Sequence, residues 1–293
     1  MRLLLLGNNG QLGWELERTL ATLGEVIPLD YPAVDLADEG QVRLQVERLA
    51  PLDVIVNAAA YTAVDRAESE PELAYAVNAR AVQILAEMAA SLRAVFIHFS
   101  TDYVFDGLKG APYVETDPPH PLGVYAASKL AGEQAIERVG GAYLILRTAW
   151  VYASRRQNFV ASVLRWARQQ TALKIVTDQV SNPTWARLLA ETTAQILAVG
   201  GRQLVPWIAE RRGLYHLAGD GYCSRFEWAQ EILRLDPRRE EQIAQALLPA
   251  QTSEFPTPAT RPLFSALDCA KFTQTFGLRL PPWQLALRLA MVE

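Results

Sequence analysis

The chain has 293 residues, of which 50% are hydrophobic, and a formal net charge of −4 at pH 7. This length and composition can fill one large core with a smaller lobe appended to it. The acidic balance leaves no basic excess to neutralise a phosphate backbone, so we expect no nucleic-acid partner. Cys223 and Cys269 lie far apart without a metal-ligand pattern, which argues against a disulfide framework or a zinc site and favours the cytoplasm. The apolar run 3–6 is too short for an export signal or a membrane span, so no membrane association is expected.

The first half of the chain alternates strand and helix patterns. Short apolar runs predict strands, and apolar residues at helical spacing predict the helices between them. The expected strands are 2–6, 25–29, 53–56, 94–99 and 142–147, and the expected helices are 14–23, 41–49, 71–90 and 125–138. This alternation predicts an α/β fold, a Rossmann-type doubly wound parallel sheet in an NAD(P)-binding domain of residues 1–150.

The rhythm changes after residue 150. We expect residues 151–293 to form a smaller C-terminal α/β lobe that mainly binds substrate, with some segments returning to the Rossmann sheet. Ser224, with Glu227 three residues later, predicts a capping box at the start of a helix. The expected helices are 158–170, 185–199, 225–235, 268–276 and 282–291, and the expected strands are 173–176 and 214–217.

The turn after the first strand is rich in glycine. Gly7, Gly10 and Gly13 are spaced three apart between an apolar strand and a helix. Such glycines permit a tight turn and let backbone N–H groups approach a pyrophosphate at the helix N-terminus. The pattern predicts a dinucleotide site, and a plain strand-to-helix turn is the alternative.

An acid follows the second strand. Asp30 stands about where a Rossmann unit places a carboxylate for the adenosine ribose hydroxyls, and the next residue, Tyr31, is not a cation. A carboxylate here repels the extra phosphate of NADPH, so the pattern favours NADH. A turn aspartate before Pro32 is the alternative. Asp35 and Leu36 in the next loop are expected on the adenine side.

Small and polar residues follow the later strands, at the edge where open parallel sheets bind ligands. The run 57–60 lets a flat ligand approach the backbone closely. Thr101 could hydrogen-bond a substrate carbonyl or hydroxyl, or else cap its own turn. Trp150 could wall a sugar or base pocket, or belong to the core. Asn78 is left open between surface and site.

Tyr125 and Lys129 lie four residues apart in a predicted helix, which puts both on one face. A phenol titrates at about 10 and is a poor proton donor at neutral pH unless a nearby cation favours the phenolate. Lys129 could supply that cation, so the pair predicts a tuned acid/base. A solvated amphipathic face has the same spacing and is the alternative.

Together these motifs resemble the extended short-chain dehydrogenase/reductase superfamily in order and spacing. Within it, essentially the whole chain resembles the dTDP-4-dehydrorhamnose reductase family. The matching runs are GQLGWEL at 10–16, VNAAAYTAVDRAESEP at 56–71, STDYVFDG at 100–107, RTAWVY at 147–152, DQ at 178–179 with PT at 183–184, and PTPATRP at 256–262.

This resemblance implies reduction of the 4-keto group of dTDP-4-dehydro-6-deoxy-L-mannose by NADH or NADPH, the last step of dTDP-L-rhamnose synthesis. Tyr125 would donate the proton, Lys129 would lower its pKa and hold the nicotinamide ribose, and Thr101 would bond the substrate near C4. The expected cofactor contacts are Gly7, Asn9, Gly10, Gln11, Leu12, Asp30, Asp35, Leu36, Ala58, Ala59, Ala60, Tyr61, Thr62, Tyr125 and Lys129. The expected substrate contacts are Thr101, Asp102, Tyr103, Trp150, Asn182 and Arg261, the last as a bidentate phosphate ligand.

One departure from the family concerns a metal. Members can share a Mg²⁺ between carboxylates at a dimer interface, and Glu15 matches one ligand, but Arg187 stands where another is expected. We therefore predict no metal ligands, and a Mg²⁺-bridged dimer is doubtful. Whether the chain forms a homodimer without Mg²⁺ is left open.

Two other functions compete with the reductase. A non-catalytic nucleotide-binding subunit, similar to the regulatory β subunit of methionine adenosyltransferase, predicts a degraded catalytic set, whereas Thr101, Tyr125 and Lys129 are all present. A nucleotide-sugar epimerase or dehydratase usually carries a Gly-x-x-Gly-Phe-x-Gly turn, whereas this turn contains Gln11 and Leu12.

Overall fold

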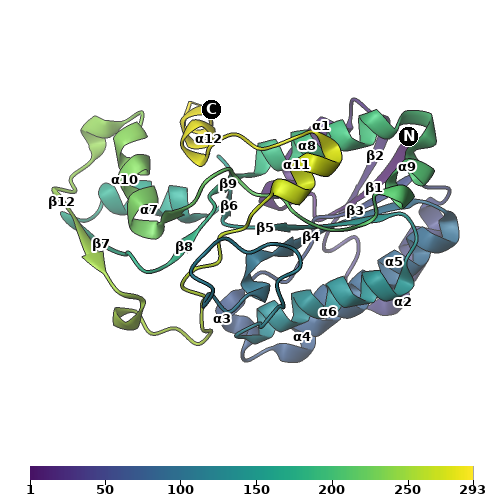
Figure 1. Ribbon diagram of the computed structural model, residues 1–293, viewed down its shortest axis with the longest axis horizontal. Coiled ribbons are helices and arrows are strands. Elements are labelled where there is room, and N and C mark those ends of the chain that lie inside the picture. Colours follow the sequence, from purple (N-terminus) through teal and green to yellow (C-terminus); the bar gives the residue numbers. More distant parts are fainter. Residues whose placement is uncertain (293) are drawn as a thin grey trace.

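Six parallel strands form the central sheet of the protein, whose computed structural model describes residues 1–292 (Figure 1). The strands follow the order β10-β5-β4-β3-β1-β2. The chain thus builds outward from β1 in both directions, which is the doubly wound topology expected from the sequence. The strands are β1 (Arg2–Leu6), β2 (Glu25–Leu29), β3 (Val54–Asn57), β4 (Val95–Thr101), β5 (Tyr143–Thr148) and β10 (Gly213–His216).

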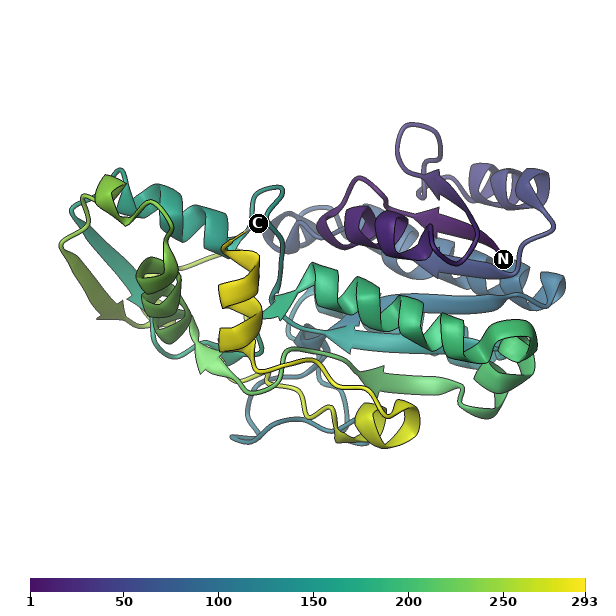
Figure 2. The same cartoon turned by 90° about the horizontal axis from the view of Figure 1, so that it is seen from above.

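Helices cover both faces of this sheet (Figures 1 and 2). Leu3 and Leu5 of β1 pack against one layer, and Leu4 and Leu6 pack against the other. Burial on both faces explains why the strands are continuously apolar rather than alternating. None of the helices within residues 1–292 is long and apolar enough to cross a membrane. One layer holds α1 (Gln11–Leu20), α8 (Ala186–Gly200), α9 (Leu204–Glu210) and α11 (Ala270–Phe276), and the other holds α2 (Glu39–Leu49), α5 (Ala81–Leu92) and α6 (Val124–Val139).

The helix expected over 71–90 is interrupted, which corrects that expectation. It divides into α4 (Pro71–Tyr75), a π-helical turn η1 (Ala76–Arg80) and α5. The turn contains Asn78, whose buried side chain accepts from Tyr61 N at 2.9 Å and donates to Ser128 Oγ at 3.0 Å. Asn78 is therefore a buried junction between the loop after β3 and helix α6.

A smaller lobe extends from the carboxyl edge of the sheet (Figures 1 and 2). Its core packs helices against a two-stranded parallel sheet of β7 and β12. The predicted capping box is confirmed, because the Ser224 side chain accepts from Glu227 N and the Glu227 side chain accepts from Ser224 N. The elements are α7 (Phe159–Ala167), β7 (Ala172–Val176), α10 (Arg225–Leu235), β12 (Ala246–Ala250) and α12 (Trp283–Ala290).

Short strand pairs connect this lobe to the main sheet. β6 (Val151–Tyr152) continues from β5 and pairs with β9 (Thr184–Trp185), which leads into α8. β8 (Val180–Ser181) pairs with β11 (Cys223–Ser224), immediately before α10. The chain therefore passes several times between the two parts.

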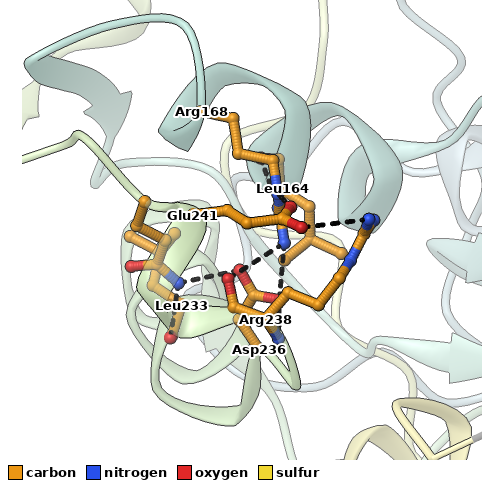
Figure 3. Close-up of polar contacts among 7 residues, drawn as sticks. Leu164, Arg168, Leu233, Asp236, Arg238 and Glu241 are labelled. Carbon is orange, nitrogen blue, oxygen red and sulfur yellow. Dashed lines mark hydrogen bonds and ion pairs between the residues drawn. The ribbon is translucent and has the colours of Figure 1, made fainter.

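A charged network ties the helices of the small lobe together, as Figure 3 shows. Arg168, at the end of α7, donates to Asp236 Oδ1 at 2.8 Å and to Glu241 Oε2 at 2.7 Å. The same guanidinium donates to Leu164 O at 2.8 Å. Asp236 follows α10, so one arginine joins α7, α10 and the turn after it.

Candidate active site

The glycine turn after β1 packs directly against the end of β3. Gly7 has φ +83°, and a Cβ at this position would lie 2.6 Å from Ala59 N. A Cβ on Gly13 would lie 2.0 Å from Gly7 O. Gly10 is the N-cap of α1 and has no side chain to accept from the first N–H groups of the helix. Those N–H groups therefore remain available to an anion. The turn therefore has the geometry expected of a pyrophosphate site.

A cavity of about 160 Å³ lies beside this turn, at the ends of β1, β2 and β3. Residues predicted for the cofactor line it together with apolar neighbours. A flat, partly apolar hollow next to a helix N-terminus suits the adenosine half of a dinucleotide. The predicted residues that line it are Gly7, Asp30, Asp35, Leu36, Ala59 and Ala60, and the others are Leu6, Leu29, Tyr31, Val34 and Val77.

Backbone amides hold the Asp30 carboxylate at this cavity. Asp30 Oδ2 accepts from Asn9 N at 2.9 Å, and Oδ1 accepts from Tyr31 N at 2.8 Å. Each carboxylate oxygen can accept a further hydrogen bond. Asp30 is thereby fixed in a position to accept ribose hydroxyls.

The other residues predicted for the cofactor surround the cavity without lining it. Gln11 Oε1 accepts from Asn158 Nδ2 at 3.0 Å, which links α1 to the start of α7. Tyr61 donates through its hydroxyl to Glu70 Oε2 at 2.5 Å. Leu12 is buried beneath the turn and Thr62 is exposed. Gly10 lies in the turn itself, Ala58 N donates to Leu6 O, and Asn9 N donates to Asp30. Tyr125 and Lys129 lie among the catalytic residues.

The predicted catalytic residues meet at the carboxyl edge of the sheet. Thr101 ends β4, and Tyr125 lies in the first turn of α6. Tyr103 packs edge-on against Tyr125, with ring centroids 6.2 Å apart. A cavity of about 10 Å³ touches both tyrosines and is closed by the segment 259–262. This is about the room that one water needs, so the hollow beside the partly exposed Tyr125 is too small for a sugar in this conformation.

An ion pair holds the closing segment in place. Arg261 donates to Asp65 Oδ1 at 3.0 Å and to Oδ2 at 2.7 Å, and Ala259 N also donates to Oδ1. Arg261 also interacts electrostatically with Tyr103, which lines the catalytic cavity. The predicted phosphate ligand therefore lies beside the site but is engaged by the carboxylate of α3 (Val64–Ala67).

The pKa of Tyr125 contradicts the expectation from spacing. Burial raises the pKa of Tyr125, a hydrogen bond with Thr101 opposes this, and the charge of Asp102 adds to it. Lys129 donates instead to Phe99 O at 2.6 Å and contacts His98 Nε2 at 3.1 Å. The expected lowering of the Tyr125 pKa by Lys129 is therefore wrong for this conformation, because the amine is engaged on the β4 side of α6.

Asp102 is buried beneath the site, where hydroxyl groups surround it. Its carboxylate accepts from Thr101 Oγ1 at 3.2 Å, from Ser181 Oγ at 2.9 Å and from Ser265 Oγ. Burial raises the pKa of Asp102 to about 6, although these hydrogen bonds oppose the shift. Asp102 thus joins β4 to β8 and to the C-terminal segment rather than opening toward the cavity.

This environment predicts a pH-dependent stability. The pKa of Asp102 is about 6 in the folded chain, and an unfolded Asp titrates at about 3.9, so between these values only the folded chain holds the proton. The stabilising effect is complete below about pH 4 and is lost as the pH rises through 6. Denaturation of wild type and Asp102→Asn should show the wild type losing about 2 kcal/mol relative to the variant from pH 4 to pH 7. A constant difference contradicts the prediction.

Trp150 lies at the junction of the two parts. It adopts φ +40° and stacks on Trp228 with ring centroids 5.4 Å apart. The Arg225 guanidinium lies 3.6 Å from the Trp150 centroid and also interacts electrostatically with Tyr103. Sequence reasoning missed Arg225, although its place directly after the Ser224 cap put it at the start of a helix. It brings a cation to the wall of the candidate substrate site.

The structure does not bring Asn182 to this cavity. Its Nδ2 donates to Gly219 O at 3.2 Å and to Gly221 O at 2.9 Å, and its Oδ1 accepts from Leu267 N at 2.7 Å. All of these partners are backbone groups of other loops. The geometry gives Asn182 a bracing position, which does not favour the expected substrate contact.

The face where family members can share Mg²⁺ holds a hollow of about 500 Å³ between α1 and α8. Burial raises the pKa of Glu15 there, and the charges of Arg187 and Arg18 oppose the shift. Glu191, the other carboxylate, accepts from Arg187 Nε at 2.9 Å. No group of three or more His, Cys, Asp or Glu side chains suited to a metal occurs within residues 1–292. Two carboxylates among guanidinium groups do not fit a divalent cation.

The sheet order, the glycine turn and the pair Tyr125 and Lys129 together define an oxidoreductase of the extended short-chain dehydrogenase/reductase class. The UDP-glucose 4-epimerase of Thermus thermophilus shares this fold, with a TM-score of 0.78 at 21% identity over 100% of this chain and 98% of its own. That likeness shows the fold alone. Comparisons at higher identity define the family.

The family model described as RmlD substrate binding domain matches residues 1–293. A dTDP-4-dehydrorhamnose reductase of Burkholderia thailandensis is 44% identical over 99% of this chain and 98% of its own. The dTDP-4-dehydrorhamnose reductase structure from Clostridium acetobutylicum has a TM-score of 0.90 at 33% identity, covering 100% of this chain and 99% of that one. The Bacillus anthracis structure, in complex with NADP, has a TM-score of 0.88 at 32% identity, covering 99% and 98%. This chain belongs to the dTDP-4-dehydrorhamnose reductase family, which confirms the resemblance.

Proposed function

We propose that this protein reduces the 4-keto group of dTDP-4-dehydro-6-deoxy-L-mannose to dTDP-L-rhamnose with NADH or NADPH, the last step of dTDP-rhamnose synthesis. The observation that carries the proposal is the position of Thr101 and Tyr125 at the same sheet edge as the cavity suited to the adenosine half of a dinucleotide. The names of the full-length relatives support the same substrate.

Tyr125 donates the proton in this reaction. The cofactor supplies a hydride to C4, and negative charge then develops on the carbonyl oxygen. A phenol beside that oxygen neutralises the charge, which contributes roughly 10²–10⁴-fold to the rate. The raised pKa of Tyr125 keeps the phenol protonated at neutral pH, as a donor requires. Thr101 donates a second hydrogen bond to the same oxygen once its single hydroxyl proton turns away from Asp102, to which it donates in this structure.

Residues 1–150 bind the cofactor in this proposal. The turn from Gly7 to Gly13 takes the pyrophosphate, and Asp30 takes the adenosine ribose. Asp35 and Leu36 face the adenine, and Lys129 reaches the nicotinamide ribose. The cavity that Gly7, Asp30, Asp35 and Leu36 line and the uncapped start of α1 support the adenosine and pyrophosphate part of this placement.

Residues 151–293 supply most of the substrate lobe. They also supply β10, an edge strand of the Rossmann sheet, and the helices α8, α9 and α11 that cover one face of it. Tyr103 lines the small cavity, and we assign Tyr103, Trp150 and Arg261 to the nucleotide sugar. Entry of a sugar nucleotide requires the segment 259–262 to move, since the cavity there is about 10 Å³. A cytoplasmic location without nucleic-acid or membrane partners remains a prediction, and homodimer formation remains open.

The direct test follows oxidation of the reduced nicotinamide by absorbance while the keto-sugar nucleotide is generated in situ. Steady turnover with added NADH or NADPH supports the reductase. Absence of turnover would overturn it in favour of a non-catalytic nucleotide-binding subunit. Chemistry that proceeds on a retained NAD⁺ without added reductant would instead identify an epimerase or dehydratase.

We predict that NADH is used with a kcat/KM on the order of tenfold above that of NADPH, because Asp30 repels the extra phosphate. Asp30→Ser should narrow this ratio, whereas Asp35→Asn, which alters an acid deeper on the adenine side, should change it less. Initial rates with both cofactors measure the ratio. A strong wild-type preference for NADPH, the cofactor form bound in the Bacillus anthracis structure, would refute the argument.

A further inference from the structure

A buried histidine lies directly behind the candidate catalytic lysine. His98 belongs to β4 and is fully buried. Its Nδ1 lies 3.1 Å from Asn57 Nδ2 on β3, and its Nε2 lies 3.1 Å from Lys129 Nζ on α6. The sequence gives no functional signal for His98, because a lone histidine in an apolar strand is typical of a buried core residue.

The orientation of the Asn57 amide is set by the backbone. Asn57 Oδ1 accepts from Ala59 N at 3.1 Å, and a backbone N–H can only donate. Exchanging the two amide atoms would place two donors against each other, so Nδ2 must face His98. Nδ1 of His98 therefore accepts a proton, and the neutral ring carries its own hydrogen on Nε2.

This tautomer determines which protonation state Lys129 can adopt. The Nε2–H of His98 points at Lys129 Nζ across 3.1 Å. An ammonium group has three donors and no acceptor, so a charged Lys129 would oppose this hydrogen. A neutral amine can accept from Nε2–H through its lone pair and still donate to Phe99 O, where the distance is 2.6 Å.

We propose that Asn57 and His98 are positioning residues that hold Lys129 as the neutral amine in the cofactor-free enzyme through a fixed imidazole tautomer. This deepens the proposed function and rests on it only for the catalytic role of Lys129. Lys129 is charged later, when a proton from solvent breaks the His98 contact and the ammonium turns toward the phenolate that Tyr125 leaves behind. The resting site therefore has a neutral phenol and a neutral amine.

Burial shifts the pKa values of both Lys129 and His98 downward. Burial lowers the pKa of Lys129 to about 8, with the charge of Glu133 opposing the shift. Glu133 is already paired with Arg147 of β5 at 2.6 Å, which screens its effect. A pKa of about 8 alone leaves most of Lys129 charged at pH 7, so the neutral amine depends on the Nε2–H of His98. Burial keeps the pKa of His98 well below its ordinary value, so the ring itself stays neutral.

Nuclear magnetic resonance can test both protonation states without turnover. The sequence contains four lysines and three histidines, so selective isotope labelling resolves each one. We expect His98 to show the Nε2–H tautomer and Lys129 to be neutral at pH 7 without cofactor. The exposed His120, replaced in His120→Gln, serves as the assignment control and should leave both signals unchanged. An Nδ1–H tautomer, or an ammonium at Lys129 at pH 7, overturns the proposal even if the reductase activity is confirmed.

Asn57→Asp provides the sharper variant. Its two carboxylate oxygens can only accept, one from Ala59 N and the other from His98, so the ring hydrogen moves to Nδ1. Nε2 then accepts from Lys129 and favours the ammonium. We expect the Lys129 titration and the pH profile of kcat to move upward by about one unit or more, which is a tenfold change in the proton equilibrium. A uniform loss of activity with an unmoved titration would show a merely structural role.

If a variant fails to fold, the wild-type spectra by themselves still determine the tautomer of His98 and the protonation state of Lys129. His98→Gln adds a second check. Its amide oxygen can accept from Lys129, so the Lys129 titration should again rise. If the titration of Lys129 moves to lower pH or does not move, the imidazole hydrogen is not what holds the amine neutral.

Discussion

Tyr125→Phe is expected to lower kcat by about 10²–10⁴-fold while cofactor affinity stays nearly unchanged. The variant keeps the ring that packs edge-on against Tyr103 and removes only the hydroxyl that donates the proton. Charge that develops on the carbonyl oxygen then has only the Thr101 hydroxyl beside it. Steady-state kinetics with saturating cofactor, together with cofactor binding by fluorescence, separates the two effects.

Tyr222→Phe is the matched control, because Tyr222 is half exposed and packs against Phe264 away from the catalytic cavity. Its kcat should equal that of the wild type. Turnover in Tyr125→Phe at the wild-type rate would remove Tyr125 from the mechanism. A large loss of cofactor affinity would instead indicate that the hydroxyl acts mainly in binding.

The positions of Thr101 and Tyr125 could be predicted because they depend on strand order alone. Parallel strands bring their carboxyl ends to one edge, so a polar run after β4 and a helix start after the next loop must lie together. The same reasoning placed Gly7 and Asp30 at one cavity. Local patterns are enough wherever topology, rather than side-chain choice, sets the neighbours.

The pKa of Tyr125 and the contacts of the Lys129 amine could not be predicted in the same way. The spacing of Tyr125 and Lys129 put them on one helical face, but burial raised the Tyr125 pKa and a histidine engaged the amine. These effects depend on β3 and β4 partners distant in sequence. The Asp65 and Arg261 pair, nearly two hundred positions apart, belongs to the same class of long-range contact.

Among the elements that the sequence did not predict, β12 and η1 show two related reasons. β12 (Ala246–Ala250) is short, contains Pro249 and lies largely exposed at the edge of the small sheet, so it has no apolar alternation. The π-helical turn η1 sits within a strongly helical run and is explained by the buried contacts of Asn78, not by local propensity. In both cases tertiary partners decide the conformation.

Glu133→Gln is expected to destabilise the protein by about 3–5 kcal/mol, because it leaves a buried guanidinium without its counter-charge. Glu133 accepts two hydrogen bonds from Arg147, at 2.9 and 2.6 Å, and one from Ser100. Both side chains of the ion pair are almost fully buried. An amide would also turn an N–H group toward the guanidinium donors. Chemical denaturation at neutral pH measures the loss.

Glu87→Gln is the matched control for this change. Glu87 pairs with Arg43 at 2.8 Å, but both side chains are substantially exposed, so its loss should cost less than about 1 kcal/mol. Equal losses in the two variants would contradict the buried-charge argument. Glu133→Leu combined with Arg147→Met should recover most of the stability, because replacing both partners removes the unpaired charge that makes the single change severe.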